Sequence, residues 1–534
     1  MNRWSEKKQK NRIKTQFGKN PMDMENWESL QLRMYEIEMY EQRRRKTFNQ
    51  EWVDDVTWND LEMDRVFARI NHTRTYMGEQ ILYHRLHGCK NRQKLQRMEK
   101  RIAFFSCQES SRIKVEEKLS HIGKQKENYY LPLFLMDEIN WPVTSCIGLY
   151  LQQVLLVICL AGTVLVRSNV WGLGLLVVAT VNLLIYLHAK NKYEGNLFAV
   201  ANMKVALDFC NWMIKSFEGN QLYADEEILQ ALEKTRKLAK QMGRWQARKY
   251  QSVTGDLTGI VQDYLAGVTL YDIVAFCHIE KALRKCRKET LQLYEFVGDV
   301  DTDIAIASFR KSLTNWCSPM IQKSGSIRLE KICHPLMDDG VANSIELRKG
   351  AIFTGANASG KSTFMKAVAI NVILAQTIHT CVAKNVKMPT IKVMTSMALR
   401  DDVVQKESYY MREMKYLKRM LDEIEKGEPV LFVIDEILKG TNTRERLGAS
   451  KAILSYMAQK PGFLLVATHD LELVKAEEDL YETYYFDSQI CGKDIIFPYK
   501  MKQGIAVRTN AIDLMEMMDF PKEITDKARI VSAR

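Results

Sequence analysis

The sequence predicts two parts: an all-α region that carries a hairpin of two apolar helices, and a following α/β domain with a mainly parallel sheet. Three observations lead to this fold class. Charge-rich amphipathic helical patterns fill most of the chain before residue 330. Two uncharged apolar runs, 147–166 and 170–187, interrupt that region. After residue 331, strand-like and helical runs alternate, which is typical of helices packed on both faces of a parallel sheet.

Composition and charge indicate a folded protein with a basic surface. The net charge of +12 and the pI near 9.0 favour acidic partners, namely nucleic acid, anionic lipid or a bound nucleotide. A generally basic surface without a dedicated partner accounts for the charge equally well. The 11 cysteines include no C-x-x-C pair and no metal-ligand spacing, which favours reduced thiols in a cytosolic setting over a disulfide framework.

The N-terminal region begins with mixed charge. Residues 1–50 are predicted to form a charged arm that leads into a helix near 27–40. The basic cluster Arg43–Lys46 either contacts phosphate or lipid headgroups or lies on a solvated helix face, and the second interpretation is favoured. Residues 51–144 then form the first part of a helical core with lever helices. The second part, residues 191–330, follows the apolar hairpin.

Residues 145–190 are predicted to form a transmembrane hairpin with helices at about 147–166 and 170–187. At a rise of 1.5 Å per residue, each run reaches about 27–30 Å, the thickness of the hydrocarbon core of a bilayer. The amides of Gln152, Gln153 and Asn182 interrupt the runs, and helix pairing is expected to satisfy them. The alternative is a buried helical hairpin inside a large soluble core.

Residues 331–534 are predicted to form the α/β domain, with a boundary close to Ser324–Ser326. The run AIFTGANASGKSTFMKAVAI fits G-x-x-x-x-G-K-[ST], the P-loop, between a short buried strand at 351–353 and a helix from Thr363 onward. In a P-loop, backbone N–H groups and the helix N-terminus surround the phosphates of a nucleoside triphosphate. The alternative is a Gly/Ser turn before an ordinary helix. The predicted nucleotide-binding residues are Gly355, Ala356, Asn357, Ala358, Ser359, Gly360, Lys361, Ser362 and Thr363.

Two further strands end in residues suited to the same chemistry. Residues 429–436 form an apolar run that ends in Asp435 and Glu436. Asp435, together with Ser362, is predicted to bind Mg²⁺, and Glu436 to act as the general base for the attacking water. Residues 462–470 form a second buried strand that ends near His469, which is predicted to contact the γ-phosphate and position the water. A purely structural histidine is the less favoured interpretation.

Ser408 precedes the helical run YYMREM and is a good N-cap residue. The simplest interpretation is that it only caps this helix. The sharper hypothesis is that its hydroxyl and the helix N-terminus face the γ-phosphate bound by a neighbouring subunit.

With these motifs assembled, the C-terminal half resembles the MutS family of DNA-repair ATPases. The segments that carry the resemblance are TGANASGKST (354–363), SYYMREM (408–414), VIDEILKGTNTRERLG (433–448) and ATHDLEL (467–473). The Gly-Thr-x-Thr loop after the acidic strand is much more specific than a P-loop alone. The sheet is therefore expected to be ABC-like, but the LSGGQ signature of ABC transporters is absent.

The resemblance implies ATP hydrolysis with Mg²⁺ in a homodimer, in which catalytic Lys361, Glu436 and His469 face Ser408 from the other subunit. The chain also departs from the family. It contains no Phe-x-Glu, the wedge of mismatch-reading members, and no room for the domain that carries it. We therefore expect a membrane-anchored MutS-related variant without the mismatch-reading domain.

Two functions remain open at this point. The first is a DNA-interacting ATPase of the repair or recombination type, held at the cell membrane by two helices with both flanks and the ATPase in the cytoplasm. The second is a membrane-embedded, ATP-driven conformational switch that acts on a protein or lipid partner without binding DNA. The basic charge and the resemblance favour the first. The hairpin and the missing wedge favour the second.

Overall fold

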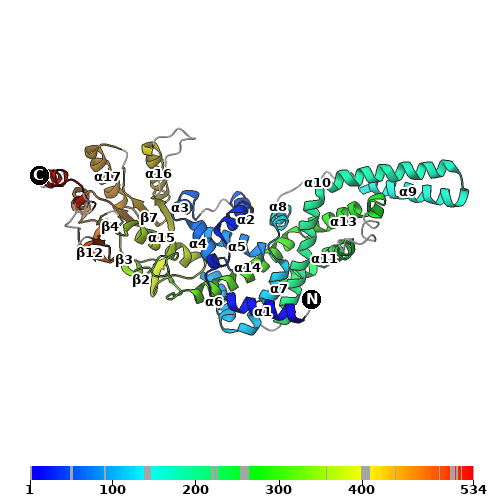
Figure 1. Cartoon of the computed structure of the whole chain (residues 1–534), viewed down its shortest axis with the longest axis horizontal. Coiled ribbons are helices and arrows are strands. Elements are labelled where there is room, and N and C mark those ends of the chain that lie inside the picture. The colour runs from blue at the N-terminus through cyan, green and yellow to red at the C-terminus, as the bar shows by residue number, and fades with distance from the viewer. Residues whose placement is uncertain are drawn as a thin grey trace.

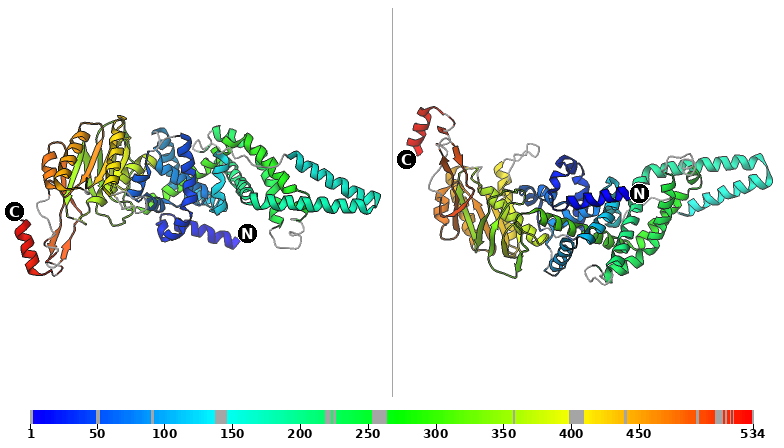
Figure 2. Two further views of the ribbon diagram at one scale, coloured as in Figure 1. Left: turned by 90° about the horizontal axis from the view of Figure 1, so that it is seen from above. Right: turned by 60° about the horizontal axis from the view of Figure 1, so that its bottom comes forward.

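The computed structural model describes residues 3–48, 52–89, 92–136, 146–217, 223, 226–252, 264–356, 358–397, 409–438, 441–491, 494–505, 512, 515–516, 518 and 520–532. Figure 1 shows an elongated molecule with a β-rich domain at one end, a helical core in the middle and a two-helix hairpin projecting from the other end. The two further views in Figure 2 show the same order. The predicted combination of a mostly helical first part and a C-terminal α/β part is confirmed.

The helical core is built around the packing of α5 (Tyr76–His87) against α14 (Arg287–Ser312). Two glycines permit their close approach. A Cβ on Gly78 would lie 2.2 Å from Asp301 Oδ2, and one on Gly298 would lie 2.3 Å from Ile81 Cγ1. The helices and short 3₁₀ turns (η) of this region are α1 (Arg3–Gln16), η1 (Pro21–Asp23), α2 (Trp27–Phe48), α3 (Asp55–Asp60), α4 (Met63–Ile70), α6 (Arg92–Cys107), α7 (Glu109–Ile122), η2 (Lys126–Tyr130), α8 (Leu131–Met136), α11 (Glu226–Ser252) and α13 (Tyr271–Lys285).

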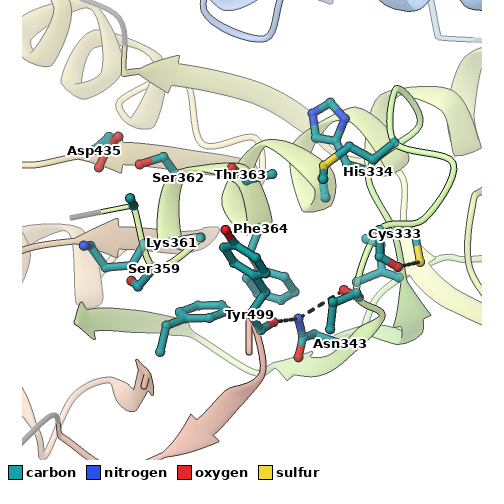
Figure 3. Close-up of a pocket in the computed structure, with 18 of the residues that line it drawn as sticks. Cys333, His334, Asn343, Ser359, Lys361, Ser362, Thr363, Phe364, Asp435 and Tyr499 are labelled. Atoms are coloured by element: carbon teal, nitrogen blue, oxygen red, sulfur yellow. Dashed lines mark hydrogen bonds between the residues drawn. The ribbon is translucent and has the colours of Figure 1, made fainter. Parts of the chain in front are cut away.

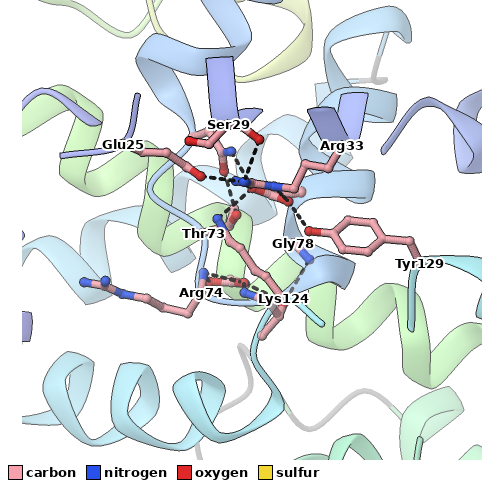
Figure 4. Close-up of polar contacts among 12 residues, drawn as sticks. Glu25, Ser29, Arg33, Thr73, Arg74, Gly78, Lys124 and Tyr129 are labelled. Atoms are coloured by element: carbon pink, nitrogen blue, oxygen red, sulfur yellow. Dashed lines mark hydrogen bonds and ion pairs between the residues drawn. The ribbon is translucent and has the colours of Figure 1, made fainter. Parts of the chain in front are cut away.

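A buried polar cluster joins α2, α5 and the loops around them (Figure 4). The carboxylate of Glu79 is fully buried and accepts hydrogen bonds from Arg33, Asn71 and Lys124, as well as from Tyr129. Burial raises the pKa of Glu79, but Lys124 and Arg33 more than offset that effect and lower it to about 2. The cluster therefore holds one satisfied anion inside the core rather than an uncompensated charge.

The helix expected near 27–40 is present as α2, but the prediction that residues 1–50 are a charged arm is wrong, because α1 and α2 are both helices with buried residues. Helix α2 packs in the core, where Leu30, Ile37 and Tyr40 are buried. The abundant charges of α2 hid this pattern, because they occupy the remaining face and separate the apolar residues along the sequence. The core therefore begins before residue 51.

The hairpin consists of α9 (Cys146–Val166) and α10 (Asn169–Ser216). By length and composition alone, Ile147–Val166 and Asn169–Ala189 are long and apolar enough to cross a membrane, and they are only 11% and 17% buried. This exposure differs from that of a hairpin inside a soluble core. The second apolar span ends at Ala189, close to the predicted 187, but the helix does not end there, since α10 is 48 residues long and runs on to Ser216 in the helical core. Residues 145–190 are therefore not a separate unit.

The α/β domain contains a six-stranded sheet in the order β12-β9-β4-β8-β7-β6, in which only β12 runs antiparallel to its neighbour. Side chains of β4, β7 and β8 alternate between two hydrophobic clusters. The α15 side is continuous with the helical core, and α16, α17 and α18 cover the other face. The elements are β4 (Gly350–Gly355), α15 (Lys361–Thr377), β6 (Lys392–Ser396), α16 (Tyr409–Ile424), β7 (Val430–Asp435), α17 (Thr443–Ala458), β8 (Phe463–Ala467), α18 (Leu471–Glu477), β9 (Glu482–Phe486) and β12 (Met501–Gln503).

A second sheet, which the sequence did not predict, has the strand order β1-β5-β2-β3. It moves the domain boundary, because β1 precedes the expected break at 324–326 yet pairs with β5. The α/β domain therefore starts near residue 320 rather than at 331. The remaining elements are β1 (Met320–Gln322), β2 (Ile327–Ile332), β3 (Asn343–Leu347), β5 (Asn385–Pro389), the β10–β11 hairpin (Gln489–Cys491 and Asp494–Ile496) and the C-terminal α20 (Lys522–Ser532).

Side-chain bonds fasten the helical core to the α/β domain at two places. The Asp60 carboxylate at the end of α3 accepts bonds from Thr395 Oγ1 (2.7 Å) and from the backbone N–H of Met397 (2.9 Å), at the end of β6. Arg310, near the end of α14, donates to Thr380 Oγ1 (2.9 Å) just after α15. The helical core is therefore bonded both to the end of β6 and to the loop that follows α15.

Candidate nucleotide-binding site

Three neighbouring parallel strands bring the predicted catalytic residues to one edge of the large sheet. In the order β4-β8-β7, Phe353 pairs with Ala467, and Ala467 pairs with Asp435. The loops after the three strands therefore leave the sheet at the same height. These loops carry the P-loop, His469 and Glu436, at the carboxyl ends of the strands where α/β sheets bind ligands.

Glycine determines the shape of the P-loop. The angle φ is +134° at Gly355 and +103° at Gly360, in the region that side chains disfavour. A Cβ on Gly355 would lie 2.5 Å from the carbonyl oxygen of Phe486, and one on Gly360 would lie 3.0 Å from Tyr499 Cδ1. The loop therefore needs glycine at both positions, for conformation and for space.

Lys361 lies inside the loop at the first residue of α15. Its Nζ donates to the carbonyl oxygens of Gly355 (2.8 Å) and Ala356 (2.9 Å). The first turn of α15 contains no acidic residue, so the helix N-terminus and the ammonium group act together on an anion. Ser359 Oγ is buried and has no hydrogen-bond partner in the described part of the chain. The loop thus offers a buried cation and an unused polar group to a phosphate.

Glu436 turns away from the end of β7 toward His469. Its backbone N–H donates to the carbonyl oxygen of Ala467 (2.9 Å), and its φ is +61°. Such left-handed backbone at a non-glycine residue costs on the order of 1–3 kcal/mol and concentrates at functional sites. Glu436 Oε1 lies 3.4 Å from His469 Nε2. The two residues predicted to handle the attacking water are therefore neighbours.

The loop that carries His469 is held from both sides. The backbone N–H of Thr468 donates to the carbonyl oxygen of Phe353 (3.0 Å), which fixes the start of the loop on β4. Asp470 accepts two bonds from Arg446, at 2.8 and 2.9 Å, which join the loop to α17. Arg446 was not among the predicted site residues, because a carboxylate partner in another loop leaves no local pattern in the sequence.

A pocket of about 690 Å³ opens beside the P-loop, within the size range of small-ligand sites. Its lining includes Lys361, Ser362, Asp435 and Glu436. Figure 3 shows Asp435 and Ser362 along one side of the pocket, with Tyr499 on the opposite side. The sheet therefore brings the P-loop residues and the two carboxylates into one cavity.

Asn343 and Tyr499 also line the pocket, although neither was a predicted site residue. Asn343 Nδ2 donates to the Tyr499 carbonyl oxygen, and Asn343 Oδ1 accepts from the N–H of Met501, both at 2.9 Å. This pair of hydrogen bonds holds Tyr499 beside the P-loop. Residues 156 positions apart carry no shared signal in a single sequence.

His334 completes one wall of the pocket from the loop between β2 and β3. Burial lowers the pKa of His334 to about 4, and the nearby Lys366 acts in the same direction. The imidazole is therefore neutral at pH 7. Lys366 itself pairs with Glu62 at 2.9 Å, so this wall is also bonded to the helical core.

The residues fit a triphosphate with Mg²⁺. Ser362 and Asp435 supply the hydroxyl and carboxylate oxygens that Mg²⁺ prefers, and water and phosphate complete its shell in such sites. Among the described residues, no group of three or more His, Cys, Asp or Glu side chains is placed to hold a metal. A site with only two protein ligands is typical of Mg²⁺, whereas a metal held in a closed site needs more ligands from the protein.

Three predicted features fall outside the described residues. They are Asn357 in the P-loop, Gly440 in the Gly-Thr-x-Thr loop, and Ser408 with its proposed contact to a neighbouring subunit. Helix α16 is described from Tyr409, directly after Ser408.

Comparison with known proteins places these residues in a family. Residues 351–534 match the family model of MutS domain V. The chain is 27% identical to the DNA mismatch repair protein MutS of Aquifex pyrophilus over 263 residues, which are 46% of this chain and 30% of that protein. It is 30% identical to the MutS protein of Natronomonas pharaonis over 243 residues, 43% of this chain and 28% of that protein.

The match is confined to part of each chain, since the curated relatives are aligned over less than a third of their own length. It includes the P-loop, the acidic strand and the histidine loop described above. Residues 351–534 are therefore a MutS domain V, and the part of the chain that the relatives match is similar to MutS proteins.

Proposed function

We propose that this protein is a MutS-like ATPase that interacts with DNA and is anchored in the cell membrane by the α9–α10 hairpin. The observation that carries the ATPase is the single pocket lined by Lys361, Ser362, Asp435 and Glu436, with His469 in contact with Glu436. The match of residues 351–534 to MutS domain V supports the same reaction.

Each residue has a distinct role in the proposed hydrolysis. Lys361 exchanges its two carbonyl partners for the β- and γ-phosphates, and the loop N–H groups bind the same oxygens. Ser362 and Asp435 hold Mg²⁺, which neutralises phosphate charge when it is bound. Glu436 takes a proton from the attacking water, and His469 orients that water.

The proposed active unit is a homodimer, as the family implies. In that dimer the partner subunit's Ser408 and the following N-terminus of α16 face the γ-phosphate across the open side of the pocket. A helix N-terminus suits this position because its free N–H groups attract anions. Nucleotide state would then change the angle between subunits and move the helical core, which is bonded to domain V through Asp60 and Arg310.

The hairpin supplies the proposed membrane anchor. Its two apolar segments remain almost entirely exposed along their length, and water would face a large continuous apolar surface there. A bilayer removes that cost, since each run matches its thickness. The flanking regions and the nucleotide site then lie together in the cytoplasm. Release of the full chain from membranes by alkaline carbonate, without detergent, would contradict this part of the proposal.

The proposed DNA partner rests on charge and family. Helix α6 presents Arg92, Lys94, Arg97 and Lys100 on its exposed side, among a net charge of +12. The curated relatives are named DNA mismatch repair proteins. Contacts of this kind release counterions from DNA, so affinity falls with salt.

The test is binding of the detergent-solubilised full chain to plain duplex DNA at several salt concentrations. We expect a linear log–log dependence, with a slope that falls by about 2.7 when Lys94, Arg97 and Lys100 are all changed to glutamine, or about 0.9 per lost phosphate contact. Unchanged binding by this triple variant would remove α6 from the interface. No binding even at low salt would instead favour the alternative, an ATP-driven switch that acts on a protein or lipid partner.

A further inference from the structure

Two side-chain amides of the hairpin, those of Gln153 and Asn182, bond to a segment outside the two apolar helices. Gln153 on α9 donates its Nε2 hydrogen to the carbonyl oxygen of Thr269 (2.8 Å). Asn182 on α10 donates its Nδ2 hydrogen to the carbonyl oxygen of Val268 (2.9 Å). Both bonds therefore reach the same short segment, which lies before α13 and outside the two apolar helices. This corrects the expectation that pairing of the two hairpin helices satisfies these amides.

The two amides lie at matching heights on the hairpin. Gln153 follows Ile147 by six residues and Asn182 precedes Ala189 by seven, counted within the two apolar spans. At 1.5 Å per residue, both lie about 10 Å inside the ends nearest the helical core. Their carbonyl partners must lie at the same height. A hairpin that crosses a bilayer over its full apolar length therefore holds this segment within about 10 Å of the hydrocarbon boundary nearest the helical core.

The segment itself is uncharged. Residues 264–271 read Tyr-Leu-Ala-Gly-Val-Thr-Leu-Tyr, and the first five are helical. Its outward side chains are apolar or aromatic: Tyr264 is 62% exposed, Leu265 58% and Tyr271 44%. Tyrosine is enriched at membrane–water boundaries, where its ring enters the apolar layer and its hydroxyl reaches water.

Packing holds the segment against the hairpin independently of the amide bonds. A Cβ on Gly267 would lie 3.0 Å from Tyr186 Cδ1, so glycine allows close contact with α10. Leu270 is fully buried in a small cluster with Leu149 and Tyr186, one residue from each hairpin helix. The segment is therefore part of the hairpin's base rather than a loose connection.

We propose that residues 264–271 are a third membrane contact, which inserts at the lipid–water interface beside the transmembrane hairpin. This inference rests on the proposed membrane insertion of the hairpin. The partner is the boundary between lipid headgroups and acyl chains. It is favoured over a protein because the exposed side chains are uncharged and because the segment is bonded to the hairpin at membrane depth.

The position of this contact gives it a mechanical consequence. Helix α13 begins at Tyr271, and α14 follows it and reaches Arg310, which is bonded to Thr380 beyond the end of the P-loop helix α15. A segment fixed at the membrane interface therefore connects through two consecutive helices to the loop that follows the helix carrying Lys361.

The test measures depth with a fluorescent amino acid encoded at single positions in the full chain, reconstituted in vesicles. The lipids carry nitroxide quenchers near the headgroup or deep in the acyl chain. We expect strong loss of fluorescence at position 264 with the shallow quencher and weaker loss with the deep one. Position 177 on α10, which is 53% exposed, should show the reverse order. Position 35 on α2 is the matched aqueous control, because Tyr35 is 66% exposed in the helical core.

The outcomes separate this inference from the anchor itself. Quenching at position 177 without quenching at position 264 would overturn the interfacial contact and leave the hairpin in the membrane. No quenching at position 177 would overturn the membrane insertion on which the inference rests. The double variant Gln153→Leu/Asn182→Leu removes both bonds and should reduce the shallow quenching at 264 while quenching at 177 remains. Unchanged quenching at 264 in that variant would show that the amides do not hold the segment.

Discussion

Replacement of Glu436 by glutamine tests the chemistry of the pocket most selectively. Glutamine keeps the length of the side chain and an oxygen acceptor, but it cannot take a proton from water. The backbone bond from residue 436 to Ala467 and the P-loop are unaffected. General base catalysis typically contributes 10²–10⁴-fold, or about 3–5 kcal/mol of barrier. We therefore expect kcat to fall by that factor while ATP binding remains within a few-fold of the parent chain.

The assay combines steady-state phosphate release with binding of a fluorescent ATP analogue, both on the solubilised full chain. Glu478→Gln is the matched control, because Glu478 is exposed after α18 and should leave both quantities unchanged. His469→Ala adds a second measurement. His469 Nε2 lies 3.4 Å from Glu436 Oε1. The kcat of the double variant Glu436→Gln/His469→Ala should therefore fall by a smaller factor than the product of the factors for the two single variants.

An unchanged kcat in Glu436→Gln would refute the assignment of Glu436 as the base. If the kcat of the double variant instead fell by the product of the two single factors, Glu436 and His469 would act on separate steps. A large loss of ATP affinity in Glu436→Gln would indicate a structural role in forming the pocket rather than a role in proton transfer.

Three further predictions concern the loop and the buried histidines. Lys361→Ala should lose tight ATP binding in the same fluorescence assay, and parent-like affinity would contradict the P-loop assignment. Gly355→Ala should lower the melting temperature by several degrees, equivalent to about 2–4 kcal/mol, because its Cβ would meet the Phe486 carbonyl oxygen at 2.5 Å. Gly448→Ala on α17 meets nothing within 4 Å and should not destabilise the protein, and a similar loss there would point to a nonspecific effect. Acidification from pH 7 to pH 5 should destabilise the folded chain by about 2 kcal/mol for each buried histidine with a lowered pKa. Between pH 6.5 and about 4, the unfolded state takes up protons at these histidines and the folded state does not. A melting temperature that stays constant over that range would contradict it. The buried histidines with a lowered pKa are His72, with a pKa of about 3, and His87 and His334, each with a pKa of about 4.

The parts of the site that come from buried strands were predictable from the sequence. Apolar runs that end in Asp435 or near His469 have few structural alternatives, and a parallel sheet brings their ends together. The P-loop strand and the start of its helix follow from the glycine pattern in the same way. In each case the local pattern and the tertiary arrangement agree.

The remaining features depend on contacts between distant residues. The second sheet contains strands as short as Met320–Gln322, which are too short for a period of two to show. The helix of α2 was expected, but its burial in the core was hidden by its charges. Tyr499 enters the site through Asn343, and Gln153 finds its partner beyond the hairpin. None of these contacts leaves a local signal.

The most direct test of a DNA-interacting ATPase at this pocket is the rate of Mg²⁺-dependent ATP hydrolysis by the full chain in lipid nanodiscs, measured with and without duplex DNA. The parent chain should hydrolyse ATP well above the rate of Lys361→Ala, and DNA should change that rate. Equal rates for the parent chain and the Lys361→Ala variant would contradict an ATPase at this pocket. Hydrolysis that DNA does not alter would retain the ATPase and contradict the DNA-interacting function.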